Sequence, residues 1–277
     1  MIKPLILLTN DDGIKSPGLA AAASALDPLG ELLIIAPLDQ QTSMGRSRVS
    51  YGSGECIFKE IQVNYQDQNW LGYGVETSPA QVVEHAVIEI ASRPISLVVS
   101  GINYGANIST NVTASGTVGA AIEGADWGIP ALAVAQEIAG TDYHSYSTSV
   151  DFSSAVHFTR IIAQDIINKK LPFDADVIKL EVPLSATPET KCVLTRLDRK
   201  QYYGTKIEER ESFLTTPTKV KRVAQKGIYS GTDTDAYALA QGWVSITPLS
   251  IDLTAHAAME EIADLFKVEK LQDEKSD

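Results

Sequence analysis

The stretch Thr9-Asn10-Asp11-Asp12-Gly13 most constrains how this chain can fold, because it places two adjacent carboxylates directly after an apolar run. That run, Ile2–Thr9, is short and almost continuously apolar, which is typical of a buried strand in a parallel sheet. In open α/β sheets, ligands bind just beyond the carboxyl ends of the strands. Asp11 and Asp12 are predicted to occupy that position.

Two interpretations of the acid pair follow from its chemistry. Adjacent carboxylates repel each other, so crowding Asp11 against Asp12 favours a bound cation, and hard oxygen ligands suit Mg²⁺, Mn²⁺ or Ca²⁺. The alternative is an Asx-rich turn that only caps the following helix, since Gly13 permits a tight turn and Pro17 suits a first helical turn. The polar loops that follow the next predicted strands help to decide between a metal site and a capping turn.

A second polar loop follows the next predicted strand, Glu31–Ala36. The loop, Leu38–Arg48, leaves a strand end and is expected to lie beside the acid pair. Its hydroxyl residues are each able to supply a neutral oxygen to a metal or a phosphate: Thr42, Ser43 and Ser47.

A third polar loop follows the predicted strand Ile95–Val99 and contains Asn103, whose carbonyl oxygen suits a hard cation. Further on, Ser115–Thr117 begins a helix. The free N–H groups and the dipole of a helix N-terminus favour an anion such as phosphate, although simple capping by Ser115 or Thr117 explains the same residues.

The order of the remaining elements predicts a Rossmann-like, doubly wound and mostly parallel sheet over residues 1–185. A hairpin is expected before a helix that begins at Ser78-Pro79 and carries His85 at the edge of its apolar face. The other predicted elements are the hairpin strands Glu55–Asn64 and Asn69–Val75, the strands Ala131–Ala135 and Val177–Leu180, and a helix from Phe152 to Ile167.

Residues 186–277 differ in character, and we expect an extended hairpin arm followed by a C-terminal oligomerisation segment. Cys192–Leu197 and Thr218–Ala224 are predicted as the long strands of the arm. Because an isolated hairpin is marginally stable, the arm is expected to pack on another subunit. The last helix has one apolar side, formed by Ile262, Ala263, Leu265 and Phe266.

Composition excludes several classes of protein. A formal net charge of −12 argues against general binding to long nucleic acids. Cys56 and Cys192 form no CxxC pair, so neither a zinc site nor a disulfide framework is indicated. The chain has no apolar run of membrane-spanning length and no signal-peptide pattern, and a cytoplasmic location is therefore expected.

The loops together resemble those of the SurE, or survival protein E, family of metal-dependent nucleotide phosphatases. The stretches that carry the resemblance are TNDDGIKSPGL, VVSGINYGAN, ASGTVGAAIEGADWGIPALA and GWVSITPLSIDLTAH. The resemblance implies a Rossmann-like domain with an arm, a homodimer or tetramer, and 5′/3′-nucleotidase activity with one Mg²⁺ or Mn²⁺ per subunit.

The resemblance also implies roles for individual residues. Asp11 and Asp12 are implied to be catalytic metal ligands together with Asn103 and one hydroxyl, for which Thr42 and Ser43 are both candidates because the loop departs from the family pattern. Phosphate contacts are implied for Asn10, Ser115, Gly116 and Thr117, and His256 is a possible general acid.

Two functional hypotheses from different classes remain at this point. In the first, the metal and the helix start stabilise the phosphoryl group of a nucleoside monophosphate or another small phosphomonoester, and either a water or an Asp carboxylate attacks. In the second, the chain is a nucleotide-binding regulatory module without turnover. A dehydrogenase is disfavoured because no GxGxxG follows the first strand.

Overall fold

The computed structural model describes residues 3–48, 56–139, 147 and 149–271. Two of the predicted strands begin at Ile2 and Glu55, and these two residues lie outside the described ranges. The β-strands are β1 Leu5–Thr9, β2 Glu31–Pro37, β3 Lys59–Tyr65, β4 Gln68–Val75, β5 Ile95–Tyr104, β6 Ala131–Gln136, β7 Val177–Val182, β8 Cys192–Leu194, β9 Tyr203–Ile207, β10 Val220–Ala224 and β11 Val244–Leu249. The helices are α1 Pro17–Leu26, α2 Pro79–His85, η1 Ala86–Ile90, η2 Ser109–Ala114, α3 Gly116–Asp126, α4 Ser153–Asn168, α5 Asp235–Ala240, η4 His256–Ala258 and α6 Met259–Phe266.

Within the described residues, nine strands form one sheet in the order β3-β4-β2-β1-β5-β6-β7-β11-β8. The central pairs are parallel, and the antiparallel pairs are β3 with β4 and β7 with β11. In this order β1 has β2 as its neighbour on one side and β5 on the other, so the chain winds outward from β1 in both directions. The predicted doubly wound, mostly parallel α/β fold is confirmed, and its switch point lies between β1 and β5.

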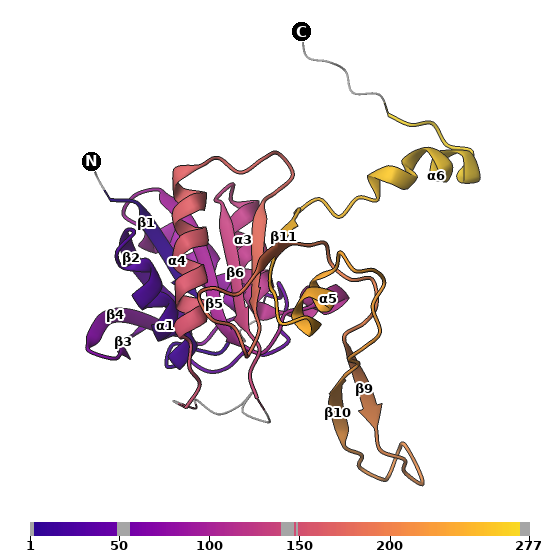
Figure 1. Ribbon diagram of the computed structural model, residues 1–277, viewed down its shortest axis with the longest axis horizontal. Coiled ribbons are helices and arrows are strands. Elements are labelled where there is room, and N and C mark those ends of the chain that lie inside the picture. Colours follow the sequence, from indigo (N-terminus) through magenta and orange to yellow (C-terminus); the bar gives the residue numbers. More distant parts are fainter. Residues whose placement is uncertain (1–2, 49–55, 140–146, 148, 272–277) are drawn as a thin grey trace.

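Alternating residues of the central strands feed two separate cores, one on each face of the sheet. Ile6 and Leu8 of β1 pack into the core that includes α1 and α4. Leu7, between them, packs into the opposite core with α2 and α3. This period of two is the reason that an unbroken apolar run is stable only when helices cover both faces (Figure 1).

The fifth strand is longer than the sequence indicates. β5 continues past Val99 to Tyr104, and its pairing with β6 shifts register between Ser100 and Asn103. Asn103 is therefore held in the irregular end of a strand and not in a free loop, and its backbone position is fixed by pairing with Ala135 of β6.

The chain after residue 185 contributes to the same sheet before and after it forms the arm. β8 and β11 pair with each other, and β11 pairs with β7. The prediction that Cys192–Leu197 forms one strand of the arm is wrong, because Cys192–Leu194 lies at the edge of the central sheet. The projecting arm in Figure 1 is instead the antiparallel pair β9 and β10.

Candidate active site

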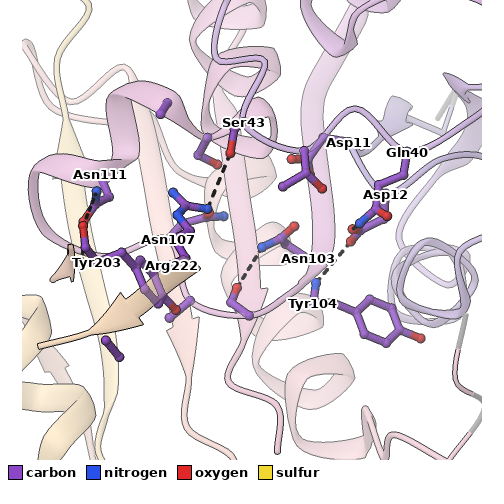
Figure 2. Close-up of a pocket in the computed structure, with 16 residues that line it drawn as sticks. Asp11, Asp12, Gln40, Ser43, Asn103, Tyr104, Asn107, Asn111, Tyr203 and Arg222 are labelled. Carbon is purple, nitrogen blue, oxygen red and sulfur yellow. Dashed lines mark hydrogen bonds between the residues drawn. The ribbon is translucent and has the colours of Figure 1, made fainter. Parts of the chain in front are cut away.

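A pocket of about 680 Å³ lies at the switch point, where β1 and β5 end. Its volume is within the range of pockets that hold small ligands. Figure 2 shows the acid pair on one side of it and residues of the arm on the other. The described residues that line it are Asp11, Asp12, Gln40, Thr42, Ser43, Asn103, Tyr104, Gly105, Ala106, Asn107, Asn111, Ala114, Ser115, Tyr203, Arg222 and Ala224.

The turn that carries the acid pair is held by Asn10. The Asn10 side-chain oxygen accepts a hydrogen bond from the Gly13 N–H at 3.0 Å, and its amide nitrogen donates to the Gly13 carbonyl at 3.1 Å. Asn10 is fully buried and is not among the described residues that line the pocket. Its observed contribution is to fix the shape of the turn.

Each carboxylate is oriented by neutral donors from other elements. The Thr117 hydroxyl donates to Asp11 at 2.6 Å, from the first turn of α3. Asp12 accepts from the backbone N–H of Tyr104 at 3.1 Å and from the Gln40 side chain at 3.1 Å. Both acids are only 4% exposed, and within the described part of the chain neither has a salt-bridge partner.

The pKa values of the two acids are raised because both side chains are buried and neither pairs with a Lys, Arg or His of the described chain. Burial raises the pKa of Asp11 to about 6, although the Thr117 hydroxyl and the backbone N–H groups of Thr117 and Gly116 act in the opposite direction. Burial and the charge of Asp11 raise the pKa of Asp12 to about 8, against hydrogen bonds from Tyr104 and Gln40. A bound divalent cation would reverse the effect, because it favours the charged form of both groups.

The N-terminus of α3 is packed directly against Asp11. A Cβ added at Gly116 would lie 2.7 Å from the Cβ of Asp11, so glycine is required for this close approach. The Ser115 hydroxyl accepts from the Val118 N–H at 3.1 Å and caps the helix. The predicted helix start is confirmed, and in the structure its first donors serve the Asp11 carboxylate.

The remaining predicted metal donors also reach the pocket. Asn103 lines it, and its amide nitrogen donates to the Gly105 carbonyl at 2.7 Å, which orients the side chain. Thr42 and Ser43 both line it as well. The Gln41 N–H donates to the Asp11 carbonyl at 2.6 Å, so the loop that carries both hydroxyls is tied to the acid turn.

Other sequence candidates lie elsewhere in the chain. His256 is exposed on η4 and pairs with Asp252 at 2.7 Å. His85 pairs with Glu89 at 2.8 Å at the end of α2, which agrees with a position at the edge of the helix face. The Ser47 carbonyl accepts from the Ser78 hydroxyl at 2.6 Å, next to the start of α2.

The structure adds residues that the sequence analysis did not single out. Gln40 and Tyr104 orient Asp12, while Asn111, Tyr203 and Arg222 form the side of the pocket nearest the arm. Tyr203 and Arg222 are separated from the acid pair by roughly 190 to 210 positions in the chain. The sequence around Arg222 predicts a strand of the arm, but it does not indicate that this strand lies beside the pocket.

These features define a class: a doubly wound α/β protein with a carboxylate-centred pocket at its switch point. The family model described as survival protein SurE matches residues 6–204. Among curated relatives, 5′-nucleotidase SurE of Thermococcus gammatolerans is 39% identical over 272 residues, covering 96% of this chain and 97% of the relative. The protein of the same name from Flavobacterium johnsoniae is 33% identical and covers 94% and 96%.

A solved structure agrees with these relatives. The crystal structure of the SurE protein from Aquifex aeolicus superposes with a TM-score of 0.73 at 28% identity, covering 95% of this chain and 100% of the other. The chain therefore belongs to the SurE family. No helix among the described residues has the length and apolar character needed to span a bilayer.

Proposed function

We propose that the protein is a divalent-metal-dependent phosphomonoesterase that hydrolyses nucleoside 5′- and 3′-monophosphates to nucleoside and phosphate. Its relatives are named 5′-nucleotidases, which supports the substrate class. The single observation that supports the chemistry is the buried acid pair, Asp11 and Asp12, which has no salt-bridge partner in the described chain and faces a nucleotide-sized pocket.

The donor set fits a hard divalent ion. Two carboxylates, the Asn103 carbonyl and a hydroxyl from Thr42 or Ser43 line one pocket. All are oxygen donors, as Mg²⁺ and Mn²⁺ prefer. The described residues contain no group of three or more His, Cys, Asp or Glu suited to a metal, so the amide and hydroxyl oxygens are essential to the proposed site.

A bound divalent ion supplies Lewis-acid chemistry, because it draws charge from a phosphoryl oxygen in the transition state. The protein's own residues hold the geometry. Thr117, Gln40 and the Tyr104 N–H fix the two carboxylates, and neutral donors of this kind keep them oriented without competing for the cation. We further propose that Ser115–Thr117 and Asn10 belong to the phosphate-binding end of the site.

The nucleophile and the general acid are open parts of the proposal. Water and an Asp carboxylate are the two candidates for attack on phosphorus. His256 is a candidate acid only if another subunit brings it to the pocket, since in its own chain it lies on the C-terminal segment paired with Asp252. Trapping of a phosphoaspartate after acid quench would exclude the water route.

Homodimerisation through the C-terminal segment is also proposed. α6 extends away from the body of the molecule in Figure 1, and it presents large apolar side chains to solvent. Leu265 is 69% exposed and Phe266 is 66% exposed. A second copy of the chain would remove this surface from water, and light scattering on the purified protein tests it.

The experiment that separates the enzyme from a non-catalytic nucleotide-binding module is phosphate release from AMP. We expect release with Mg²⁺ or Mn²⁺ and none with EDTA. A panel of nucleotides and metals then defines the preferred base, sugar position and ion. Tight AMP binding with no release under any metal condition would favour the binding module and contradict the proposal.

A further inference from the structure

Arg222 is the only Lys, Arg or His among the described residues that line the pocket. The same lining contains two carboxylates, Asp11 and Asp12. Once a divalent ion balances this pair, a phosphomonoester dianion entering the pocket still needs a counter-charge. Within the described lining, only Arg222 is able to supply one.

The backbone donors of the nearest helix do not remove this need. The N–H groups of Gly116 and Thr117 already act on the Asp11 carboxylate. The Ser115 hydroxyl accepts from the Val118 N–H as a helix cap. The N-terminus of α3 is therefore partly committed to holding an acid of the protein, which increases the importance of a separate cation.

Arg222 reaches the pocket from the arm. It lies on β10, and its Nη1 donates to the Ser43 hydroxyl at 3.4 Å, as Figure 2 shows. Ser43 is one of the two candidate hydroxyl ligands, so the guanidinium lies next to the proposed metal end. The guanidinium carbon is 5.1 Å from the centroid of the Tyr203 ring, a cation–π distance that holds the group on the pocket side of the arm.

Tyr203 is in turn fixed to the wall of the pocket by Asn111. The Asn111 side-chain oxygen accepts from the Tyr203 N–H at 2.9 Å, and its amide nitrogen donates to the Tyr203 carbonyl at 3.5 Å. Asn111 belongs to η2, which directly precedes Ser115. The start of β9 is thus pinned beside the site, and this contact places the paired strand β10 within reach of it.

We propose that Arg222 binds the phosphate group of the substrate and that Tyr203 is the residue that positions it. The proposal rests on the proposed phosphomonoesterase function. A guanidinium matches phosphate with a planar fork of N–H donors, which explains the use of arginine at this position. The arm is then a part of the active site, and its docking contributes to substrate binding.

The test compares Arg222→Gln with Lys221→Gln, which removes the same charge from the adjacent position. Lys221 pairs with Glu208 at 2.8 Å and is not among the described residues that line the pocket. Turnover is measured on AMP and on ribose 5-phosphate, which carries the same phosphate without a base. Affinity for inorganic phosphate is measured by calorimetry with Mg²⁺ present.

Loss of a charge-assisted contact predicts that Arg222→Gln lowers kcat/KM by about 10- to 100-fold on both substrates and weakens phosphate binding by a similar factor. Arg222→Lys is expected to recover part of the loss. Tyr203→Leu is expected to raise KM more than it lowers kcat, while Tyr203→Phe, which keeps the ring, is expected to recover most of that loss. Lys221→Gln should change neither turnover nor phosphate affinity.

Three results would overturn the proposal: unchanged phosphate affinity in Arg222→Gln, a loss confined to AMP, or an equal loss in Lys221→Gln. The second result would move Arg222 to the base. Failure of the proposed function has a different signature, because wild-type protein would then release no phosphate from either substrate while the phosphate-affinity comparison still decides the role of Arg222.

Discussion

Two groups of buried acids next to the central sheet differ in whether the described chain supplies a cation for them. Asp11 and Asp12 follow β1 and meet only neutral donors in the described chain. Glu181 on β7 and Asp235 at the start of α5 flank Lys179, whose Nζ lies 3.6 Å and 3.1 Å from them. All three members of the second group are at most 1% exposed.

The difference indicates what each group does. The group around Lys179 is balanced internally and organises backbone: Glu181 accepts from the Asn107 N–H at 3.0 Å, and Asp235 accepts from the Ser109 and Asp198 N–H groups, each at 3.0 Å. It ties the pocket loop to the base of the arm. Among the described residues the Asp11–Asp12 pair has no such partner, and it opens on a pocket, which supports our proposal that it binds a divalent ion.

The largest predicted effect is on catalysis. Asp12→Asn retains the shape of the side chain but removes the charge of a proposed metal ligand, and we expect metal-dependent phosphate release to fall at least about 1,000-fold, or about 4 kcal/mol in the activation barrier. Asp39→Asn is the matched control, because Asp39 is exposed in the neighbouring loop and outside the described pocket lining. Equal activity of Asp12→Asn and wild type would contradict the proposal that the Asp11–Asp12 pair serves catalysis.

The balanced group should respond in stability. Lys179→Met leaves Asp235 buried without its cation, and we expect the free energy of unfolding to fall by about 3 to 5 kcal/mol. Chemical denaturation measures this, with Lys169→Met as control because Lys169 is exposed directly after α4. If the loss does not exceed that of the control, the ion pair does not hold the fold.

The pH dependence of stability sharpens the comparison through Glu181. Burial raises its pKa to about 8, against the attraction of Lys179. Because the folded state then binds a proton that the unfolded state releases above pH 4.5, the stability from this group is present below pH 4.5 and is lost as the pH rises through 8. We expect Glu181→Gln to remove about 3 to 4 kcal/mol of the fall in unfolding free energy between pH 5 and 8. Parallel pH profiles for the two proteins would contradict this account.

The smallest predicted effect concerns a residue that acts through an acid. Thr117→Val removes the 2.6 Å hydrogen bond to Asp11, and we expect about a 10-fold loss in activity or metal affinity, as for other residues that orient a ligand. Thr159→Val is the control, since its buried hydroxyl has no hydrogen-bond partner among the described residues. A loss of the same size in both variants would indicate a general packing effect.

The acid pair was predictable because adjacent residues need no knowledge of the tertiary fold. Asp11 and Asp12 follow a buried strand, and Asn103 lies near the end of another. Because the carboxyl ends of parallel strands meet at the same edge of the sheet, these residues are expected to lie together. The contacts of Thr117 and Arg222 with the site depend on pairs 106 and 179 positions apart, which local pattern does not specify.

The balanced group had one local signal. Lys179 stands inside an otherwise apolar predicted strand, and a buried lysine requires an anionic partner. Glu181 follows on the same strand, but Asp235 lies in a helix that only the fold brings near. The arm strand was misassigned for a related reason, since Cys192–Leu194 pairs with β11, about 50 residues further along the chain.

Calorimetric titration with Mn²⁺ tests most directly whether the acid pair holds an ion that the protein itself does not supply. The account predicts one ion bound per chain in the wild type, no measurable binding in Asp12→Asn, and unchanged binding in Asp39→Asn. Wild-type protein that binds no Mn²⁺, or an Asp12→Asn variant that binds it as tightly as the wild type, would contradict it.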